Sequence, residues 1–130
     1  MKKLLLAGII VAAFTFVWGA ARAQDVAKVS PATNKVLVDN AYVRVLQATF
    51  APGAKEGLHT HPASFYYVTM PGKLKVSYAD GTVEMWEPPL GESAWMDGEK
   101  PHTAENVGTT TLQYIMIEVK GAPTAFPNSK

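Results

Sequence analysis

The chain has 130 residues, of which 48% are hydrophobic and 18% charged, and it contains no cysteine. A chain of this length has room for one domain. The absence of cysteine excludes a disulfide framework and thiolate chemistry, so any bound metal must use nitrogen or oxygen ligands. The 12 basic and 11 acidic residues form no basic run, and we therefore expect no nucleic-acid partner.

Residues 1–23 have the pattern of a secretory signal peptide. A basic start is followed by a long apolar stretch and then by the motif Ala21-Arg22-Ala23. We predict cleavage before Gln24, a periplasmic or secreted protein, and no membrane contact after cleavage. The alternative is an uncleaved anchor, because the uncharged run from residue 4 to 21 is about the minimum length that spans a bilayer. The cleaved chain would carry 9 basic and 11 acidic residues, a net charge near −2.

Short β-strands are expected throughout the rest of the chain. Runs rich in β-branched and aromatic residues are separated by Gly, Pro, Asp or Asn, a pattern typical of strands and tight turns. No run after the signal has the apolar spacing of a helix of standard length. The predicted strands cover residues 36–38, 42–50, 65–70, 74–78, 82–86, 93–96, 103–107 and 110–119. Short strands at this even spacing predict an all-β sandwich or barrel.

The same pattern predicts the domain boundaries. Residues 24–40 are expected to form an N-terminal arm and a first strand, with the polar part up to Asn34 as a loose arm or an edge segment. Residues 41–120 are expected to form the barrel, and residues 121–130 a C-terminal tail.

The three histidines are the residues most informative about chemistry. His59 and His61 are two residues apart, so both rings lie on one face of a strand. His102 can complete a set of three imidazoles from another strand. Such a set leaves coordination positions open, as in catalytic metal sites, and imidazole binds Fe, Mn, Ni, Cu and Zn. The three histidines could together hold one divalent metal ion, but a lone His-Thr-His pair is more often solvated and without a ligand role. The residues around them decide between the two.

The residues around these histidines resemble the two motifs of the cupin superfamily. The first motif reads G-x5-H-x-H-x(3,4)-E-x6-G and the second G-x5-P-x-G-x2-H-x3-N. The chain matches them at Gly53, His59, His61, Gly72, Gly91, His102 and Asn106. The resemblance covers residues 42–120. It implies a conical jelly-roll barrel, the double-stranded β-helix, that is frequently a homodimer and holds its metal near one end of the interior.

Phe65 departs from the first motif in a way that bears on the metal. It occupies the position where cupins usually supply a glutamate ligand. In the second motif, Asp97 and Glu99 stand where a proline and a glycine are usual, with the spacing unchanged.

Three interpretations of the missing glutamate are compatible with the sequence. In the first, three neutral histidines alone hold the metal, as in the thiol dioxygenase branch of cupins, and the positive site attracts an anionic substrate. In the second, Gln47 or Glu118 replaces the ligand. Burial of Glu118 without a partner would be costly, and we favour pairing with Arg44 or exposure at an edge over ligation. In the third, no metal is held tightly and the histidines line a pocket for a small polar molecule.

Four further residues are predicted to line the pocket: Gln47, Phe65, Tyr67 and Trp95. Tyr67 shares the strand alternation of Phe65, and Trp95 lies on the strand that approaches His102. The remaining aromatic residues are expected to fill the core.

Two functions are compatible with these features. The first is a metal-dependent oxygenase or isomerase of a small metabolite, in which the metal acts as Lewis acid or oxygen binder. The second is a non-enzymatic barrel that binds or senses a small molecule or a metal, which the lack of an acidic base at the usual position favours slightly. The sequence shows no catalytic Ser-His-acid pattern and no phosphate-binding glycine loop.

Overall fold

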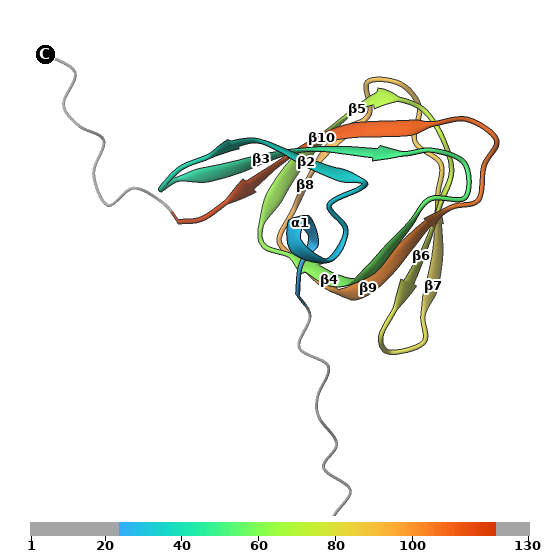
Figure 1. Cartoon of the computed structure of the whole chain (residues 1–130), viewed down its shortest axis with the longest axis horizontal. Helices are drawn as coiled ribbons and strands as arrows, with labels where there is room; N and C mark the ends of the chain where they lie inside the picture. The colour runs from blue at the N-terminus through green and yellow to red at the C-terminus, as the bar shows by residue number, and fades with distance from the viewer. Residues whose placement is uncertain (1–23, 122–130) are drawn as a thin grey trace, which may run out of the picture.

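The computed structural model describes residues 24–121, which form two facing β-sheets with one short helix (Figure 1). The first sheet has the strand order β2(Asn34–Asp39), β3(Val43–Phe50), β10(Leu112–Val119), β5(Ser64–Met70), β8(Ser93–Met96). The second has the order β1(Gln24–Asp25), β4(Lys55–His61), β9(Glu99–Asn106), β6(Leu74–Tyr78), β7(Val83–Trp86). The predicted all-β architecture is confirmed. The predicted signal peptide and all but the first residue of the predicted tail lie outside the described residues.

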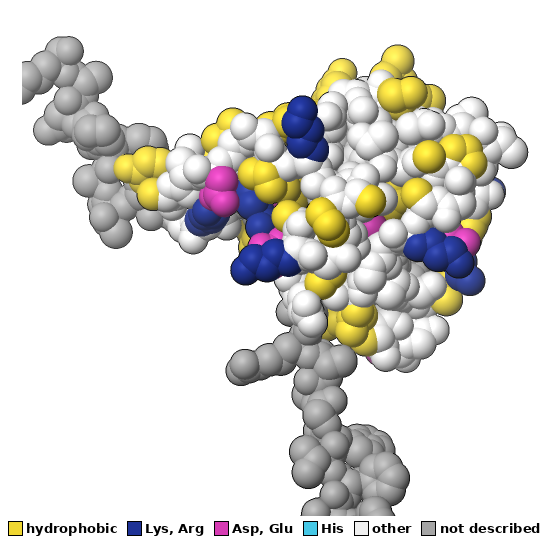
Figure 2. Space-filling view, viewed as in Figure 1, with side chains coloured by type: hydrophobic (Ala, Val, Ile, Leu, Met, Phe, Trp, Pro, Cys, Tyr) yellow, Lys and Arg dark blue, Asp and Glu magenta, His cyan; other side chains and the backbone are white. Residues whose placement is uncertain are grey.

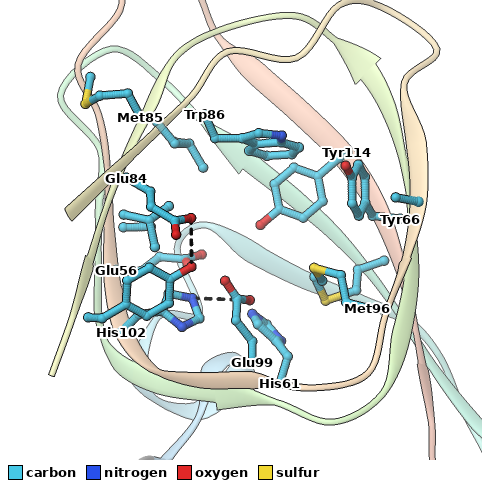
Figure 3. A pocket seen from close by; sticks show the side chains of 16 residues that line it. Glu56, His61, Tyr66, Glu84, Met85, Trp86, Met96, Glu99, His102 and Tyr114 are labelled. Atoms are coloured by element: carbon cyan, nitrogen blue, oxygen red, sulfur yellow. Dashed lines mark hydrogen bonds and ion pairs between the residues drawn. The ribbon is translucent and has the colours of Figure 1, made fainter. Parts of the chain in front are cut away.

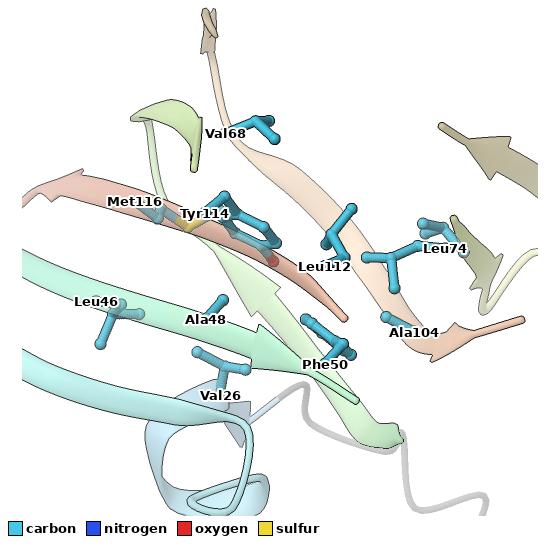
Figure 4. Close-up of a cluster of buried hydrophobic side chains, with 11 residues drawn as sticks. Val26, Leu46, Ala48, Phe50, Val68, Leu74, Ala104, Leu112, Tyr114 and Met116 are labelled. Carbon is cyan, nitrogen blue, oxygen red and sulfur yellow. The ribbon is translucent and has the colours of Figure 1, made fainter. Parts of the chain in front are cut away.

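Strand alternation builds the core between the two sheets. In β3 the side chains of Leu46, Ala48 and Phe50 point inward, while their neighbours face the other side. β10 contributes its alternate residues in the same way, and the ring of Phe50 stacks on that of Tyr114 at a centroid distance of 6.3 Å. Figure 4 shows these side chains converging from several strands. Burial of this apolar surface is the main stabilising contribution to a domain without disulfides.

The N-terminal arm is packed, not loose. β1 pairs in parallel with β4, and the helix α1(Val26–Val29) follows it directly. Asp25 caps this helix, since its side chain accepts a hydrogen bond from the backbone N–H of Ala27. Val26 is fully buried in the core. Of the two expectations for this arm, a loose arm or an edge segment, the structure therefore agrees with the second, because β1 lies at the edge of its sheet.

The outer surface carries dispersed charges. On the face drawn in Figure 2, lysine and arginine side chains lie in separate small groups, with apolar side chains between them. Between residues 24 and 121, no helix has the length and apolar character that crossing a bilayer requires.

Candidate metal centre

Two neighbouring strands bring the three histidines together. His59 and His61 project inward from β4, and His59 lies directly opposite His102 in the antiparallel pairing of β4 with β9. All three side chains are buried, and each offers a ring nitrogen within 4.8 Å of those of the other two. The structure thus gathers the three predicted ligands in one place.

Each histidine is held in the orientation of a metal ligand by its Nδ1 atom. Nδ1 of His59 donates to the carbonyl oxygen of Gly57 and Nδ1 of His102 to that of Lys100, both at 2.7 Å. Nδ1 of His61 donates to Oε1 of Glu118 at 2.9 Å. Because these partners are acceptors, the proton resides on Nδ1 and the Nε2 lone pair is free to bind a metal.

The spacing of the free nitrogens fits a bound cation. Nε2 of His59 lies 3.1 Å from Nε2 of His61. Two nitrogens bound to a metal at about 2.1 Å and at right angles are about 3.0 Å apart. Burial lowers the pKa of His59 to about 4, so this ring is neutral at pH 7. With both Nδ1 atoms donating to their own acceptors, the two Nε2 atoms face each other, and a cation between them would bind both.

A chain of charged groups supports His61 from behind. Glu118, of which 2% is exposed, uses Oε1 for His61. Its Oε2 accepts a hydrogen bond from Nε of Arg44 at 2.7 Å and forms an ion pair with Nη2 at 2.6 Å. Nη1 of Arg44 donates in turn to both carboxylate oxygens of Asp25, at 2.8 and 2.7 Å. The predicted pairing of Glu118 with Arg44 is confirmed. Because both oxygens of Glu118 are occupied, it orients a ligand and is not itself a fourth ligand.

Glu56 also lies beside the histidine cluster, and the sequence did not reveal this carboxylate as part of the site. Its Oε2 lies 3.5 Å from Nε2 of His59. Its Oε1 accepts hydrogen bonds from Oγ1 of Thr33, at 2.8 Å, and from Nδ2 of Asn34. Burial raises the pKa of Glu56, and the two hydrogen bonds offset part of this effect. With Oε1 held by two donors, Oε2 is the oxygen that faces the cluster.

A cavity of about 310 Å³ opens beside the histidines (Figure 3). His61, His102, Glu56 and Glu99 lie on one side of it, and Oε2 of Glu99 is 3.6 Å from Nε2 of His102. Aromatic and methionine side chains form much of the remaining wall. The volume lies at the lower end of the range for small-molecule sites.

Solved structures share this architecture. A cupin domain from Bordetella pertussis Tohama I is 25% identical, with a TM-score of 0.61, over 68% of this chain and 92% of that one. An RmlC-like cupin family protein with a double-stranded β-helix fold from Methanocaldococcus jannaschii is 12% identical, with a TM-score of 0.53, over 86% and 93%. The chain has the cupin fold. The polyketide cyclase RemF from Streptomyces resistomycificus shares it at 18% identity and a TM-score of 0.51, over 69% and 66%. No protein-family model matches the chain, and no curated protein matches it.

The interior of the cupin barrel does not contain the four predicted pocket residues. Phe65, Tyr67 and Trp95 are 37%, 47% and 54% exposed, and none lines the cavity. Gln47 is half-buried on the face of β3 opposite to the core, and it does not line the cavity either. The pocket prediction therefore assigned the wrong alternation to β3 and β5. The inward-facing neighbours of Phe65 are Ser64 and Tyr66, and neither supplies a carboxylate.

Two β-bulges explain why Glu56 and Glu99 join the histidines. In a regular strand, residues three apart face opposite sides. Between the pairs Glu56↔Ala104 and His59↔His102, β4 advances three residues while β9 moves two. Between His59↔His102 and His61↔Glu99 the extra residue lies in β9 instead. Each bulge absorbs one residue, so that each glutamate shares a face with the histidine three positions after it.

Proposed function

We propose that this cupin barrel is a metal-dependent enzyme that binds one divalent metal ion. The observation that carries this proposal is the anchoring of three Nδ1 atoms, which leaves three Nε2 atoms free and gathered together. His59, His61 and His102 would hold the metal, and Oε2 of Glu56 would be the fourth ligand in place of the glutamate that Phe65 replaces. Fe, Mn, Ni, Cu and Zn all suit imidazole with carboxylate ligands.

The residues of the chain would divide the work at such a site. The bound metal would supply Lewis acidity or an open coordination position for oxygen. Glu118 keeps the ring of His61 in the ligand orientation through its hydrogen bond to Nδ1. Glu99 faces the cavity beside His102 and is available to accept a proton from a bound molecule. Tyr66, Trp86 and Tyr114 line the cavity and would contact the apolar part of a bound molecule.

The reaction we propose is that of an isomerase or an oxygenase acting on a small metabolite. Glu99 supports the isomerase, since its carboxylate lines the cavity beside His102 and would serve as the proton acceptor that the usual position lacks. A non-enzymatic barrel that binds or senses a small molecule or a metal is the second candidate, because an aromatic pocket of this size also suits simple binding. Turnover in the metal-loaded protein distinguishes the two.

The metal is tested by elemental analysis of protein produced from the full chain without a histidine tag. We expect near-stoichiometric divalent metal in the original protein and its loss in the His59→Ala and His61→Ala variants. Thr60→Ala is the matched control, because Thr60 lies between the two ligands on the same strand and is only half-buried. Absence of metal after anaerobic addition of Fe(II) or Zn(II), or equal metal content in the histidine variants, would overturn the proposal.

We also propose that the barrel forms a homodimer through the outer face of the first sheet. Side chains paired directly across its five strands form an apolar row that faces away from the core: Val38, Val45, Ile117, Phe65 and Trp95. A continuous apolar row of this kind is typical of an interaction surface. The symmetric homodimer is the commonest assembly of soluble proteins.

Export is the last part of the proposed function. Cleavage before Gln24 would retain β1, α1 and Asp25, and with them every described contact of the N-terminal arm with the metal centre. N-terminal sequencing of the protein recovered from the periplasmic fraction tests this, with Gln24 as the expected first residue. A start at Met1 in the membrane fraction would contradict it.

A further inference from the structure

The cavity has an apolar aromatic wall. The rings of Tyr66, Trp86 and Tyr114 pack edge to face in sequence, with centroid distances of 5.3 and 5.5 Å. Oε1 of Glu92 accepts hydrogen bonds from the Tyr66 hydroxyl, at 2.9 Å, and from Nε1 of Trp86, at 3.1 Å. These two polar atoms are thus occupied, and the part of each ring that reaches the cavity is mainly hydrocarbon. Such a wall favours a ligand with an apolar or aromatic body.

The charged groups that line the same cavity are all carboxylates. They are Glu56, Glu84 and Glu99, and no lysine or arginine lines the cavity among residues 24–121. Lys100 lines a neighbouring cavity instead, where its exposed ammonium pairs with Asp80 at 3.4 Å. Three carboxyl groups thus line the pocket, and no cationic Lys or Arg side chain among the described residues faces them there. An anionic ligand would therefore meet repulsion from the pocket walls.

Tyr114 adds a hydroxyl group to the lining of the cavity. Its side chain is 7% exposed, and its hydroxyl makes no hydrogen bond with any of the described residues. Figure 3 shows this hydroxyl directed into the cavity, between the aromatic wall and the glutamates. Burial and the nearby carboxylates hold the pKa of Tyr114 well above its usual value, so the hydroxyl stays protonated. The hydroxyl opens onto the cavity, where a polar atom of a ligand would form a hydrogen bond with it.

We propose that the pocket binds a small amine with an aromatic or otherwise apolar body and discriminates against carboxylates and phosphates. The aromatic wall would contact the body of the ligand, and the ammonium group would lie toward Glu84 and Glu99. Aromatic faces also attract cations, which adds to the effect of the carboxylates. The chemistry at this pocket rests on the proposed metal site, but the charge preference follows from the pocket walls alone. It is the opposite of what the first of the three interpretations of the missing glutamate implies, namely a site that attracts an anionic substrate.

The test compares three ligands that share one body: phenethylamine, 2-phenylethanol and phenylacetate. Their dissociation constants are measured by calorimetry on the full chain, both chelator-treated and loaded with zinc, with the bound zinc quantified in each sample. In the zinc-free protein we expect phenethylamine to bind at least ten-fold more tightly than phenylacetate, with the alcohol between them. Glu99→Gln should reduce that ratio several-fold. Glu105→Gln is the matched control, since Glu105 lies on the same strand, faces outward and pairs with Lys55.

Each outcome separates this inference from the metal proposal. Tighter binding of phenylacetate than of phenethylamine, equal binding of the two, or no binding of any of the three at millimolar concentration would overturn the ligand class. The metal proposal would stand in those cases if zinc is bound stoichiometrically. Preference for the amine in a protein that binds no zinc would support the ligand class and reject the metal.

Discussion

The strand pairs β3–β10 and β4–β9 differ in regularity, and the difference separates the stable part of the barrel from its chemical part. The β3–β10 ladder runs from Leu112↔Phe50 to Val119↔Val43 without a shift in register. The β4–β9 ladder shifts twice within the few residues around the histidines. The regular pair fixes the core and the support of His61, whereas the irregular pair turns two extra carboxylates toward the ligands. Bulges are a recognised way of redirecting side chains at functional sites.

The largest effect is expected from damage to the regular pair. Phe50 is fully buried and stacks on Tyr114, so Phe50→Ala should lower the free energy of unfolding by about 3–5 kcal/mol. Val45→Ala, on the opposite face of the same strand, should cost less than about 1 kcal/mol. Urea unfolding of both variants checks this. Similar losses in the two would mean that β3 does not have the described alternation.

The next effect concerns the charged chain that connects the regular pair to the site. Arg44→Ala would leave the carboxylates of Glu118 and Asp25 without their cation, and we expect a loss of about 3 kcal/mol in the free energy of unfolding. Arg44→Lys keeps the charge but loses the forked geometry and should lose less. Chemical denaturation measures both. An unchanged stability in Arg44→Ala would show that the pairing is not formed.

A smaller effect is expected when the support of His61 is weakened without removing a ligand. Glu118→Gln retains an acceptor for Nδ1 but removes the charge, and we expect zinc affinity to fall about 10-fold to 100-fold. Glu105→Gln serves again as control and should leave the affinity unchanged. Competition with a chromogenic chelator measures both constants. Equal affinities in the two variants would show that Glu118 has no role in positioning His61.

A substitution on the outer face of the first sheet is expected to have the smallest effect on stability but a clear effect on assembly. Phe65→Glu would place a charge within the apolar row, next to its central residue Ile117, and should convert the proposed dimer to a monomer. The free energy of unfolding of the subunit should change by less than about 0.5 kcal/mol, because the residue is exposed. Light scattering during size exclusion gives the mass, with Val83→Glu, exposed on the other sheet, as control. A monomeric original protein would contradict the dimer.

The contrast between the two strand pairs also explains what the sequence could and could not predict. The motif spacing predicted the three histidines together, and the alternation of β10 is regular enough that Glu118 falls opposite Arg44 as expected. Glu56 and Glu99 each lie three residues before a histidine of the cluster, His59 and His102. Simple strand alternation therefore places each glutamate on the face opposite to that histidine. Only the bulges reverse this, and bulge positions are set by pairing between strands far apart in sequence.

The errors in the pocket prediction have a related cause. The motif aligns Phe65 with the usual ligand glutamate, and strand alternation then predicts that Tyr67 also faces inward. The structure has the opposite alternation in β5, with Tyr66 in the cavity. Aromatic residues are frequent on both faces of this strand, so hydrophobicity alone could not decide between them. The sequence does not predict the burial of Val26, because this residue belongs to a helix of only one turn, too short for a periodic signal.

The central claim is that Nε2 atoms of three histidines share one metal ion, and X-ray absorption spectroscopy of the zinc-loaded protein tests it most directly. We predict a first shell with three imidazole nitrogens at about 2.0–2.1 Å and at least one oxygen, the carboxylate of Glu56 among them. Glu56→Gln should change the oxygen contribution and leave the three imidazoles in place. A first shell with fewer than three imidazoles would contradict the account.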